Sequence, residues 1–292
     1  MMSSDLVFKN IVVVGLGLIG GSILQSLKSR SFKGSTFGID SNLSAITQAN
    51  KLGLIINKDQ NIDTDLQNLL VVFSVPALSM SQAIDDLNFK SEDVLYTDTC
   101  SVKSSVLEDI KKRKSEFLAK FVLSHPIAGS EKSGISASSS NLFDKKLTIV
   151  CPHENNAEED INKVEGFWQN LGSLTKRLPA NNHDDLFAKT SHLPHVISYA
   201  LMHSIFKDLD DETFLYSGGS LEGYTRIASS DPVMWKDIMI ANEGSIVESI
   251  KQFKASLEIL LDMIQKKDPI ELTNFFTSIK TSRDALLSEE NN

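Results

Sequence analysis

Residues 13–25 read VVGLGLIGGSILQ, and this stretch decides the fold. It carries Gly15, Gly17 and Gly20 as G-x-G-x-x-G between the apolar run 11–14, which is typical of a buried parallel strand, and a segment with helical character. In that setting the first glycine makes a tight turn, the second lets a pyrophosphate approach the backbone, and the third lets the helix pack closely on the strand. The stretch therefore predicts a dinucleotide site at a helix N-terminus, where unpaired N–H groups attract phosphate.

A second short strand is predicted over residues 35–40, STFGID, and it ends in Asp40. Asp40 follows Gly20 at the spacing at which a carboxylate binds the adenosine ribose hydroxyls. The carboxylate would repel a 2′-phosphate, and the neighbouring Ser41 and Asn42 supply no cation, so NAD is predicted in preference to NADP. The motif also leaves open a glycine-rich turn in some other α/β domain. The predicted cofactor-binding residues are Gly15, Gly17, Leu18, Ile19, Gly20, Asp40, Ser74, Val75 and Ser101.

Composition and charge exclude several classes of protein. The 292 residues are 41% hydrophobic and 23% charged, which is enough for two domains with a sizeable core. The net charge of −9 and the lack of a basic stripe argue against nucleic-acid binding. The two cysteines, Cys100 and Cys151, form no C-x-x-C pair, so no metal site is predicted. No signal peptide and no apolar run of about 18 residues is found, so we expect a cytoplasmic protein without a membrane partner.

Strand and helix patterns alternate over the first part of the chain. Helices are expected over residues 43–52, 77–87, about 101–114 and 157–171, and strands over 54–57, 69–75, 94–97, 121–123, 147–151 and 174–178. This alternation predicts an α/β fold with a doubly wound, mostly parallel sheet of the Rossmann type. Residues 128–140, rich in Gly and Ser, are expected to form an ordered loop with a short helix, a candidate lid.

From residue 179 onward the strand signals end, and amphipathic segments over 180–206 and 232–264 take over. We therefore predict an NAD-binding Rossmann-like domain, 1–179, followed by an all-helical substrate-binding and dimerisation domain, 180–292. The wide apolar stripes of these helices make a second copy of the chain the expected partner.

Polar residues at predicted strand ends mark the rim where ligands bind such sheets. Among them, His125 titrates near neutral pH and can take a proton from a substrate hydroxyl, although a lone histidine is also compatible with a structural role. Ser101 opens a helix, where a simple N-cap is the alternative. Arg226, one of only five arginines, follows the Gly218-Gly219 turn, which favours bidentate binding of a carboxylate over a surface salt bridge.

A series of short segments occurs in a specific order along the chain. They are GLGLIGGS (15–22), D-x-x-S-V-K (98–103), HPIAGSEKSG (125–134), SHLPH (191–195), TRIA (225–228) and DPVMW (231–235). Together they resemble the prephenate dehydrogenase (TyrA) family of tyrosine biosynthesis, and the resemblance extends from about Ile11 to Ile279.

The resemblance implies oxidative decarboxylation of prephenate to 4-hydroxyphenylpyruvate, with hydride transfer to NAD+. It implies that His125 is the base, that Ser101 orients it, and that Arg226 holds the ring carboxylate. His195 is expected to face the substrate side chain. The other expected pocket residues are Ser191, Ser130, Glu131 (in an ion-pair network with Arg226) and Trp235. Some relatives carry an Asp at the position of Gly223, so an acidic gate cannot be assumed here.

Three alternatives stay open at this stage. An arogenate or dual-specificity cyclohexadienyl dehydrogenase would act on an amine in place of the side-chain keto group, which no motif decides, although His195 favours prephenate. A β-hydroxyacid dehydrogenase would use a lysine of its helical domain as acid–base. A nucleotide-sensing regulator would bind NAD without turnover, and the set of His125, Ser101 and Arg226 argues against it.

Overall fold

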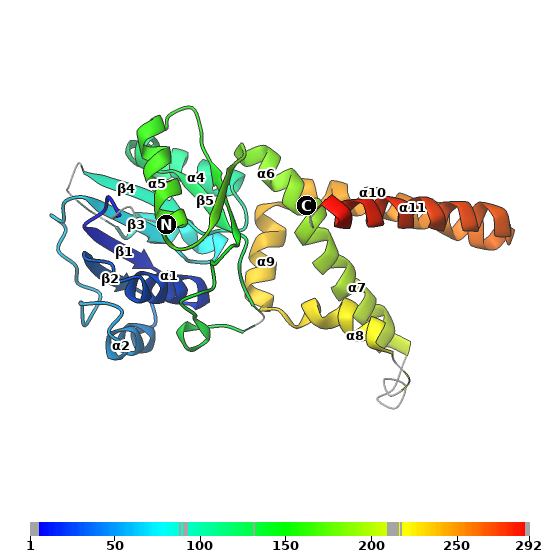
Figure 1. The fold of residues 1–292 in the computed structure, drawn as a ribbon, viewed down its shortest axis with the longest axis horizontal. Helices are drawn as coiled ribbons and strands as arrows, with labels where there is room; N and C mark the ends of the chain where they lie inside the picture. The colour runs from blue at the N-terminus through cyan, green and yellow to red at the C-terminus, as the bar shows by residue number, and fades with distance from the viewer. Residues whose placement is uncertain are drawn as a thin grey trace. The chain divides into compact units, whose positions relative to one another are not determined.

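The computed structural model describes residues 6–87, 89, 93–130, 132–208, 216 and 218–289 (Figure 1). The chain divides into two compact units, Met1–Ile246 and Val247–Asn292. The first unit holds all the described strands, and the second is helical. This division lies at a different place from the predicted domain boundary between residues 179 and 180, which rests on the change from strands to helices. That predicted boundary stays a prediction.

Four parallel strands form the first sheet in the order β2-β1-β3-β4. Their bounds are β1 Asn10–Val14, β2 Ser35–Ile39, β3 Leu69–Phe73 and β4 Val94–Asp98. The central strand β3 is apolar throughout, and β1 is apolar after Asn10, because both faces of the sheet are covered. The strand order reverses between β1 and β3, which is where ligands bind in open α/β sheets.

A second, three-stranded sheet has the order β5-β6-β7. β5 (Leu123–Pro126) runs antiparallel to β6 (Leu147–Cys151), and β6 runs parallel to β7 (Leu174–Arg177). A single parallel bridge, Tyr96↔Phe121, joins the two sheets. The predicted α/β class with a mostly parallel sheet is therefore confirmed, and β5 is its antiparallel exception.

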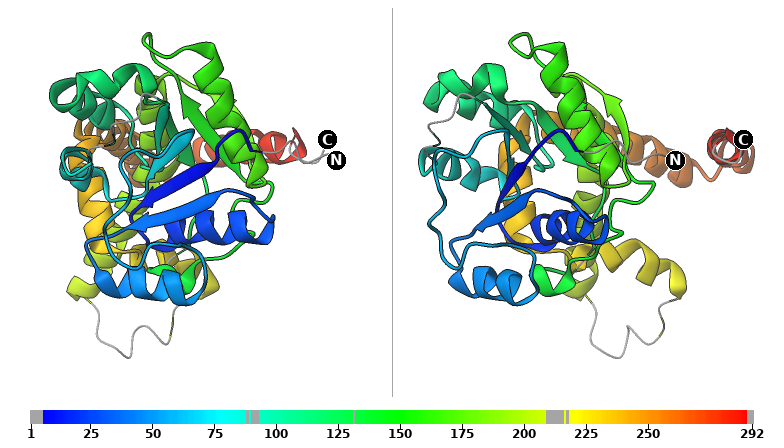
Figure 2. Two further views of the ribbon diagram at one scale, coloured as in Figure 1. Left: turned by 90° about the vertical axis from the view of Figure 1, so that its left-hand side faces the viewer. Right: turned by 60° about the vertical axis from the view of Figure 1, so that its left-hand side comes forward.

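Within the first unit, helices pack on both sides of the strands (Figure 2). Those of the first half are α1 Leu18–Ser29, α2 Leu43–Lys51, α3 Met80–Asp85, α4 Ser104–Arg113 and α5 Glu158–Asn170. Those that follow are α6 Ala180–Phe187, α7 Leu193–Asp208, α8 Gly219–Thr225, α9 Pro232–Ala241, α10 Glu243–Lys266 and α11 Pro269–Glu289. No helix within the described ranges has the length and apolar character needed to cross a membrane.

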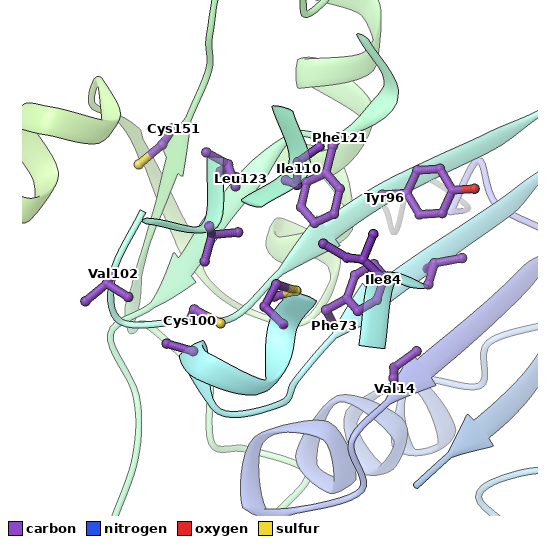
Figure 3. Packing of buried hydrophobic residues seen from close by; sticks show 14 of the residues in the cluster. Val14, Phe73, Ile84, Tyr96, Cys100, Val102, Ile110, Phe121, Leu123 and Cys151 are labelled. Carbon is purple, nitrogen blue, oxygen red and sulfur yellow. The ribbon is translucent and has the colours of Figure 1, made fainter. Parts of the chain in front are cut away.

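Successive residues of β1 point to two different apolar clusters. Val12 and Val14 belong to one cluster, and Ile11 and Val13 belong to the other, as the two-residue period of a strand requires. In the first cluster the ring of Phe73 stacks on that of Phe121 with centroids 5.6 Å apart (Figure 3). The continuous apolar run in β1 is thus explained by burial on both faces.

The strand expected over residues 54–57 is wrong, because a side chain replaces the strand ladder there. The amide of Asn57 accepts from the Gly38 N–H at 2.9 Å and donates to the Gly38 carbonyl at 2.7 Å. Asn57 therefore satisfies the edge of β2 from an irregular segment. The helix expected over 77–87 is also shorter, with a 3-10 turn at Ala77–Ser79 before α3.

The Gly- and Ser-rich segment 128–140 does contain a short 3-10 helix, Ile135–Ala137. Gln25 of α1 donates to Ser138, and Gln48 of α2 donates to Ser136 at 2.9 Å. The segment is thus tied to both helices, and its role as a lid stays a prediction.

Candidate active site

The glycine-rich turn has the geometry expected of a dinucleotide site. Gly15 has φ +95°, and a Cβ atom there would lie 2.3 Å from the carbonyl oxygen of Ser74. A Cβ atom at Gly20 would lie 2.0 Å from the carbonyl oxygen of Gly15. Around Gly17, by contrast, a Cβ atom would meet nothing within 4 Å. Two glycines are therefore required by the protein itself, and the third leaves open space at the N-terminus of α1.

Asp40 lies directly beside this turn. Its Oδ2 accepts from the backbone N–H of Leu16 at 2.7 Å, and its Oδ1 accepts from that of Asn42 at 2.8 Å. The N-terminus of α1 carries no side-chain cap and no acidic residue in its first turn. Open space, free N–H groups and a carboxylate at the end of β2 fit the pyrophosphate and the ribose of a dinucleotide.

His125 lies in β5, buried with 8% of its surface exposed. Its Nδ1 is 2.8 Å from Nε2 of His183 in α6, and Nδ1 of His183 is 2.9 Å from Oδ1 of Asp184. Burial, with further contributions from His183, Lys103 and His192, holds the pKa of His125 well below its usual value. His125 is therefore neutral at physiological pH, which is the form that can accept a proton.

A buried ion pair fixes the backbone next to His125. Lys103 and Asp98 have no exposed side-chain surface, and Nζ of Lys103 donates to Oδ2 of Asp98 and, at 2.6 Å, to the Ser124 carbonyl. The Ser124 N–H donates to Oδ1 of Asp98 at 3.0 Å, and the Ser124 hydroxyl donates to the Asp98 carbonyl at 2.6 Å. Side chains thus join β4 to β5 where the ladder between the two strands is missing.

A second cluster forms around His195 in α7. The His195 ring stacks on Trp235 of α9 with centroids 3.7 Å apart, and Nδ1 is 2.9 Å from the Ser191 carbonyl. Burial lowers the pKa of His195, and the nearby Arg226 lowers it further. Ser191 lies in a π-helical turn, Ala188–His192, a feature that often accompanies functional sites. The structure thus groups four of the residues predicted to bind substrate.

The two clusters are connected by hydrogen bonds within the first unit. The side-chain amide of Asn242 donates to the Asp184 carbonyl at 2.9 Å and lies 3.3 Å from Nδ1 of His192. His192 meets Trp235 edge to face at 6.0 Å. Burial lowers the pKa of His192 to about 4, so its ring is neutral as well.

The remaining predicted site residues that the structure describes are joined by hydrogen bonds to neither the His125 cluster nor the His195 cluster. Leu18 and Ile19 open α1, the Ser74 hydroxyl accepts from Thr99 at 3.2 Å, and the Ser130 hydroxyl accepts from the Lys132 N–H at 3.2 Å. Val75 is partly buried and lies beside Gly15. A Cβ atom added to Gly15 would lie 3.1 Å from a methyl carbon of Val75. Glu131, with its expected ion pair, lies outside the described residues.

Ser101 is not the N-cap of the helix that follows it. The N-cap is Lys103, and the first backbone N–H groups of α4 are bound by the carboxylate of Asp184. Among the described residues, His183 hydrogen-bonds to His125 and Ser101 does not. The role of Ser101 in orienting His125 therefore stays a prediction.

Sequence reasoning missed His183, Asp184 and Asn242, and it included His192 only within the SHLPH segment, without a role of its own. Most of the candidates came from the ends of strands, whereas these residues lie on helices or on the turns between them. The available signal was the adjacent pair His183-Asp184 early in an amphipathic helix, with His183 and Phe187 one turn apart on the buried face.

Comparison with known proteins identifies the family. A family model described as prephenate dehydrogenase, nucleotide-binding domain, matches residues 23–176, and one described as prephenate dehydrogenase, dimerization domain, matches residues 179–278. The chain belongs to the prephenate dehydrogenase family. The resemblance found in the sequence is thereby confirmed, and the match to the nucleotide-binding model begins at residue 23, shortly after the glycine-rich turn.

Individual members of this family resemble the chain over nearly its full length. The cyclohexadienyl dehydrogenase of Zymomonas mobilis is 31% identical, over 97% of this chain and 98% of that protein. The prephenate dehydrogenase of Bacillus subtilis is 27% identical, over 94% of this chain and 76% of that protein. The crystal structure of Aquifex aeolicus prephenate dehydrogenase with hydroxyphenyl propionate and NAD+ matches with a TM-score of 0.88 and 32% identity, covering 96% of this chain and 98% of that one.

Proposed function

We propose that this protein catalyses the NAD+-dependent oxidative decarboxylation of prephenate to 4-hydroxyphenylpyruvate in tyrosine biosynthesis. The observation that carries the proposal is the buried, neutral His125, held through Nδ1 in the same compact unit as the glycine-rich turn and the cluster of His195, Trp235 and Arg226. Family membership and the solved NAD+ complex of a relative support the cofactor and the reaction class.

The chemistry that bound NAD+ supplies is acceptance of a hydride. The glycine-rich turn and Asp40 would hold it, as the open space at Gly17 and the bond from the Leu16 N–H to Asp40 allow. The substrate is a dicarboxylate, so the site needs a local cation in a chain of net charge −9. Arg226 fills that need by binding the ring carboxylate, and His195 faces the side chain.

His125 takes the proton of the ring hydroxyl while the hydride leaves the carbinol carbon. The C–O bond gains double-bond character, the bond to the ring carboxylate breaks, and its electron pair completes the aromatic ring as CO2 leaves. His125 then returns its proton to the phenolate oxygen. No net proton is consumed, and the aromatic ring makes the step favourable.

The direct test is to mix the purified protein with NAD+ and prephenate and to follow NADH, with arogenate in a parallel assay. We expect turnover with a higher kcat/KM for prephenate. The second candidate is a cyclohexadienyl dehydrogenase acting on both substrates, which the 31% identity to the Zymomonas mobilis enzyme supports. Comparable kcat/KM values for the two substrates would favour that candidate, and a clear preference for arogenate would favour an arogenate dehydrogenase. No NADH with either substrate would refute all three.

We further propose that the enzyme is a cytoplasmic homodimer. The family model over residues 179–278 describes a dimerization domain, which supports this assembly. The second unit exposes a series of apolar side chains that a partner would cover. They are Val247, Ile250, Leu257, Ile259, Leu261, Ile264, Ile270, Phe276, Ile279 and Leu286.

Arg226→Gln is expected to raise KM for prephenate by about 10–100-fold with a smaller change in kcat, because a charge-assisted hydrogen bond contributes about 1.5–3 kcal/mol. Steady-state kinetics at saturating NAD+ measure this change. The matched control is Arg113→Gln, which removes an exposed ion pair between Arg113 of α4 and Asp85 of α3 and should leave KM unchanged. An unaltered KM in Arg226→Gln would remove Arg226 from the substrate site.

Asp40→Ala is expected to weaken NAD+ binding by about 10–100-fold and to affect NADP+ less, because the lost carboxylate binds ribose hydroxyls but repels a 2′-phosphate. The ratio of Kd values for the two cofactors, measured by titration, reports the change. Asp63→Ala, at an exposed loop aspartate, serves as the control and should keep the wild-type ratio. A constant ratio in Asp40→Ala would contradict the predicted cofactor site.

A further inference from the structure

We propose that His183 is a positioning residue that holds His125 in one tautomer, with the ring proton on Nδ1 and a lone pair on Nε2. The structure places His183 between His125 and Asp184, with nitrogen–nitrogen and nitrogen–oxygen distances of 2.8 Å and 2.9 Å. The catalytic meaning of this arrangement rests on the proposed function, in which His125 is the base. The tautomer itself follows from the hydrogen-bond chain alone.

The series of hydrogen bonds starts at the carboxylate of Asp184, which can only accept hydrogen bonds. Its Oδ1 receives the backbone N–H of Lys103 and its Oδ2 receives that of Ser104, each at 2.8 Å, and backbone N–H groups cannot accept in return. Burial opposes ionisation of Asp184, but hydrogen bonds from His183, Ser104 and Lys103 hold the pKa of its carboxyl below the usual value. Asp184 is therefore a carboxylate at the N-terminus of α4, where a negative charge is favourable.

The Asp184 carboxylate determines which ring nitrogen of His183 carries the proton. Its Nδ1 faces the Asp184 carboxylate and must be the donor. The ring has no exposed surface, and burial lowers its pKa, so it carries only this one proton. Nε2 of His183 is left with a lone pair, and that lone pair points at Nδ1 of His125.

His125 must therefore donate from Nδ1. The opposite arrangement would place two lone pairs, or two N–H groups, against each other in a buried site, which costs about 1–3 kcal/mol for each unsatisfied group. The centroid of the Phe187 ring lies 4.9 Å from that of His125 and 4.4 Å from that of His183, so Phe187 packs against both imidazoles. His125 consequently presents the lone pair of Nε2 to the substrate hydroxyl before any substrate arrives.

The same chain serves the protonated form of His125. When Nε2 accepts a proton, Nδ1–H still donates to His183, and the carboxylate of Asp184 lies one ring further on. The Nδ1–H of the protonated ring thus keeps its acceptor, and no proton has to move along these hydrogen bonds. The side-chain amide of Asn242 donates to the Asp184 carbonyl, and this hydrogen bond connects Asp184 to the helices around His195.

The tautomer can be observed directly in the wild-type protein. With all six histidines labelled with 15N, a long-range 1H–15N correlation distinguishes protonated from unprotonated ring nitrogens, and the His125→Asn and His183→Asn variants assign the two rings. We expect Nδ1 of His125 to be protonated and Nε2 to be unprotonated. A protonated Nε2 in neutral His125 would overturn the proposal, whether or not the protein turns over prephenate.

Kinetics provide the second arm, with a rescue variant. His183→Asn keeps an amide near Asp184 but does not reach His125, whereas His183→Gln can bring an amide oxygen close to the position of Nε2. We expect His183→Asn to lower kcat by about 10–100-fold with KM nearly unchanged, and His183→Gln to recover most of it. His153→Asn is the matched control, since its Nε2 lies 3.0 Å from the Phe121 carbonyl in a different hydrogen-bond network.

Equal losses of kcat in both His183 variants, together with a lowered unfolding midpoint in both, would show a merely structural role and would overturn the proposal. Wild-type kcat in His183→Asn would overturn it as well. If the wild-type protein fails to oxidise either substrate, the proposed function is wrong, and the 15N measurement still decides whether His183 sets the tautomer.

Discussion

His125→Asn is expected to lower kcat for prephenate by about 10²–10⁴-fold and to leave KM near the wild-type value. The substitution removes the group proposed to receive the hydroxyl proton, and it leaves in place Arg226 and His195, which are proposed to bind the substrate. The amide of asparagine has no basic ring nitrogen, so it cannot accept the proton as the imidazole does. Initial rates of NADH formation over a range of prephenate concentrations measure both constants.

The matched control for that variant is His203→Asn, which changes an exposed histidine of α7. It should leave both constants unchanged. A titration with NAD+ should show that His125→Asn still binds the cofactor, so that a lower rate can be assigned to the chemical step. A kcat within a few-fold of wild type would show that His125 is not the base.

Lys103→Met is expected to reduce the free energy of unfolding by about 3–5 kcal/mol, because it leaves the Asp98 carboxylate buried without its cation. Both side chains of the pair are fully buried, so solvent does not screen the loss. The Lys103 ammonium also binds the Ser124 carbonyl, so the join between β4 and β5 is weakened at the same point. Urea unfolding measures the change.

Tryptophan fluorescence is well suited to that measurement. The two tryptophans, Trp168 and Trp235, lie in the first compact unit and are buried, so their emission reports the unfolding of this unit. Lys112→Met, which removes an exposed charge from α4, should change the free energy by less than about 0.5 kcal/mol. Coinciding urea curves for Lys103→Met and the wild type would mean that the buried pair contributes nothing to stability.

The parts of the fold that the sequence predicted are those set by local rules. The turn at Gly15 needs a positive φ, and the contact between Gly20 and the Gly15 carbonyl requires the smallest residue, so both leave a direct mark on the sequence. The apolar runs of β1 and β3 reflect burial on both faces of the sheet, which also appears directly in the sequence. Local pattern therefore sufficed for the glycine-rich turn and the central strands.

The parts that it missed depend on contacts between distant residues. His125 and His183 are 58 positions apart, and nothing near His183 in the sequence indicates which strand it meets. Asn57 replaces a strand by pairing its side chain with Gly38, which strand propensity cannot anticipate. Asp98 and Lys103 were noticed as part of a motif, but their pairing inside the core became visible only with β4 and β5 in place.

The three buried imidazoles of His125, His183 and His192 make the fold sensitive to acid. In the unfolded chain each would protonate near its usual pKa of about 6.5, whereas burial lowers the pKa of all three in the folded protein. Their contribution to folding is therefore complete above about pH 6.5 and is lost as the pH falls toward the folded values, by up to about 1.4 kcal/mol per pH unit for each ring. Mild acidification is thus expected to lower the free energy of unfolding through these three rings alone.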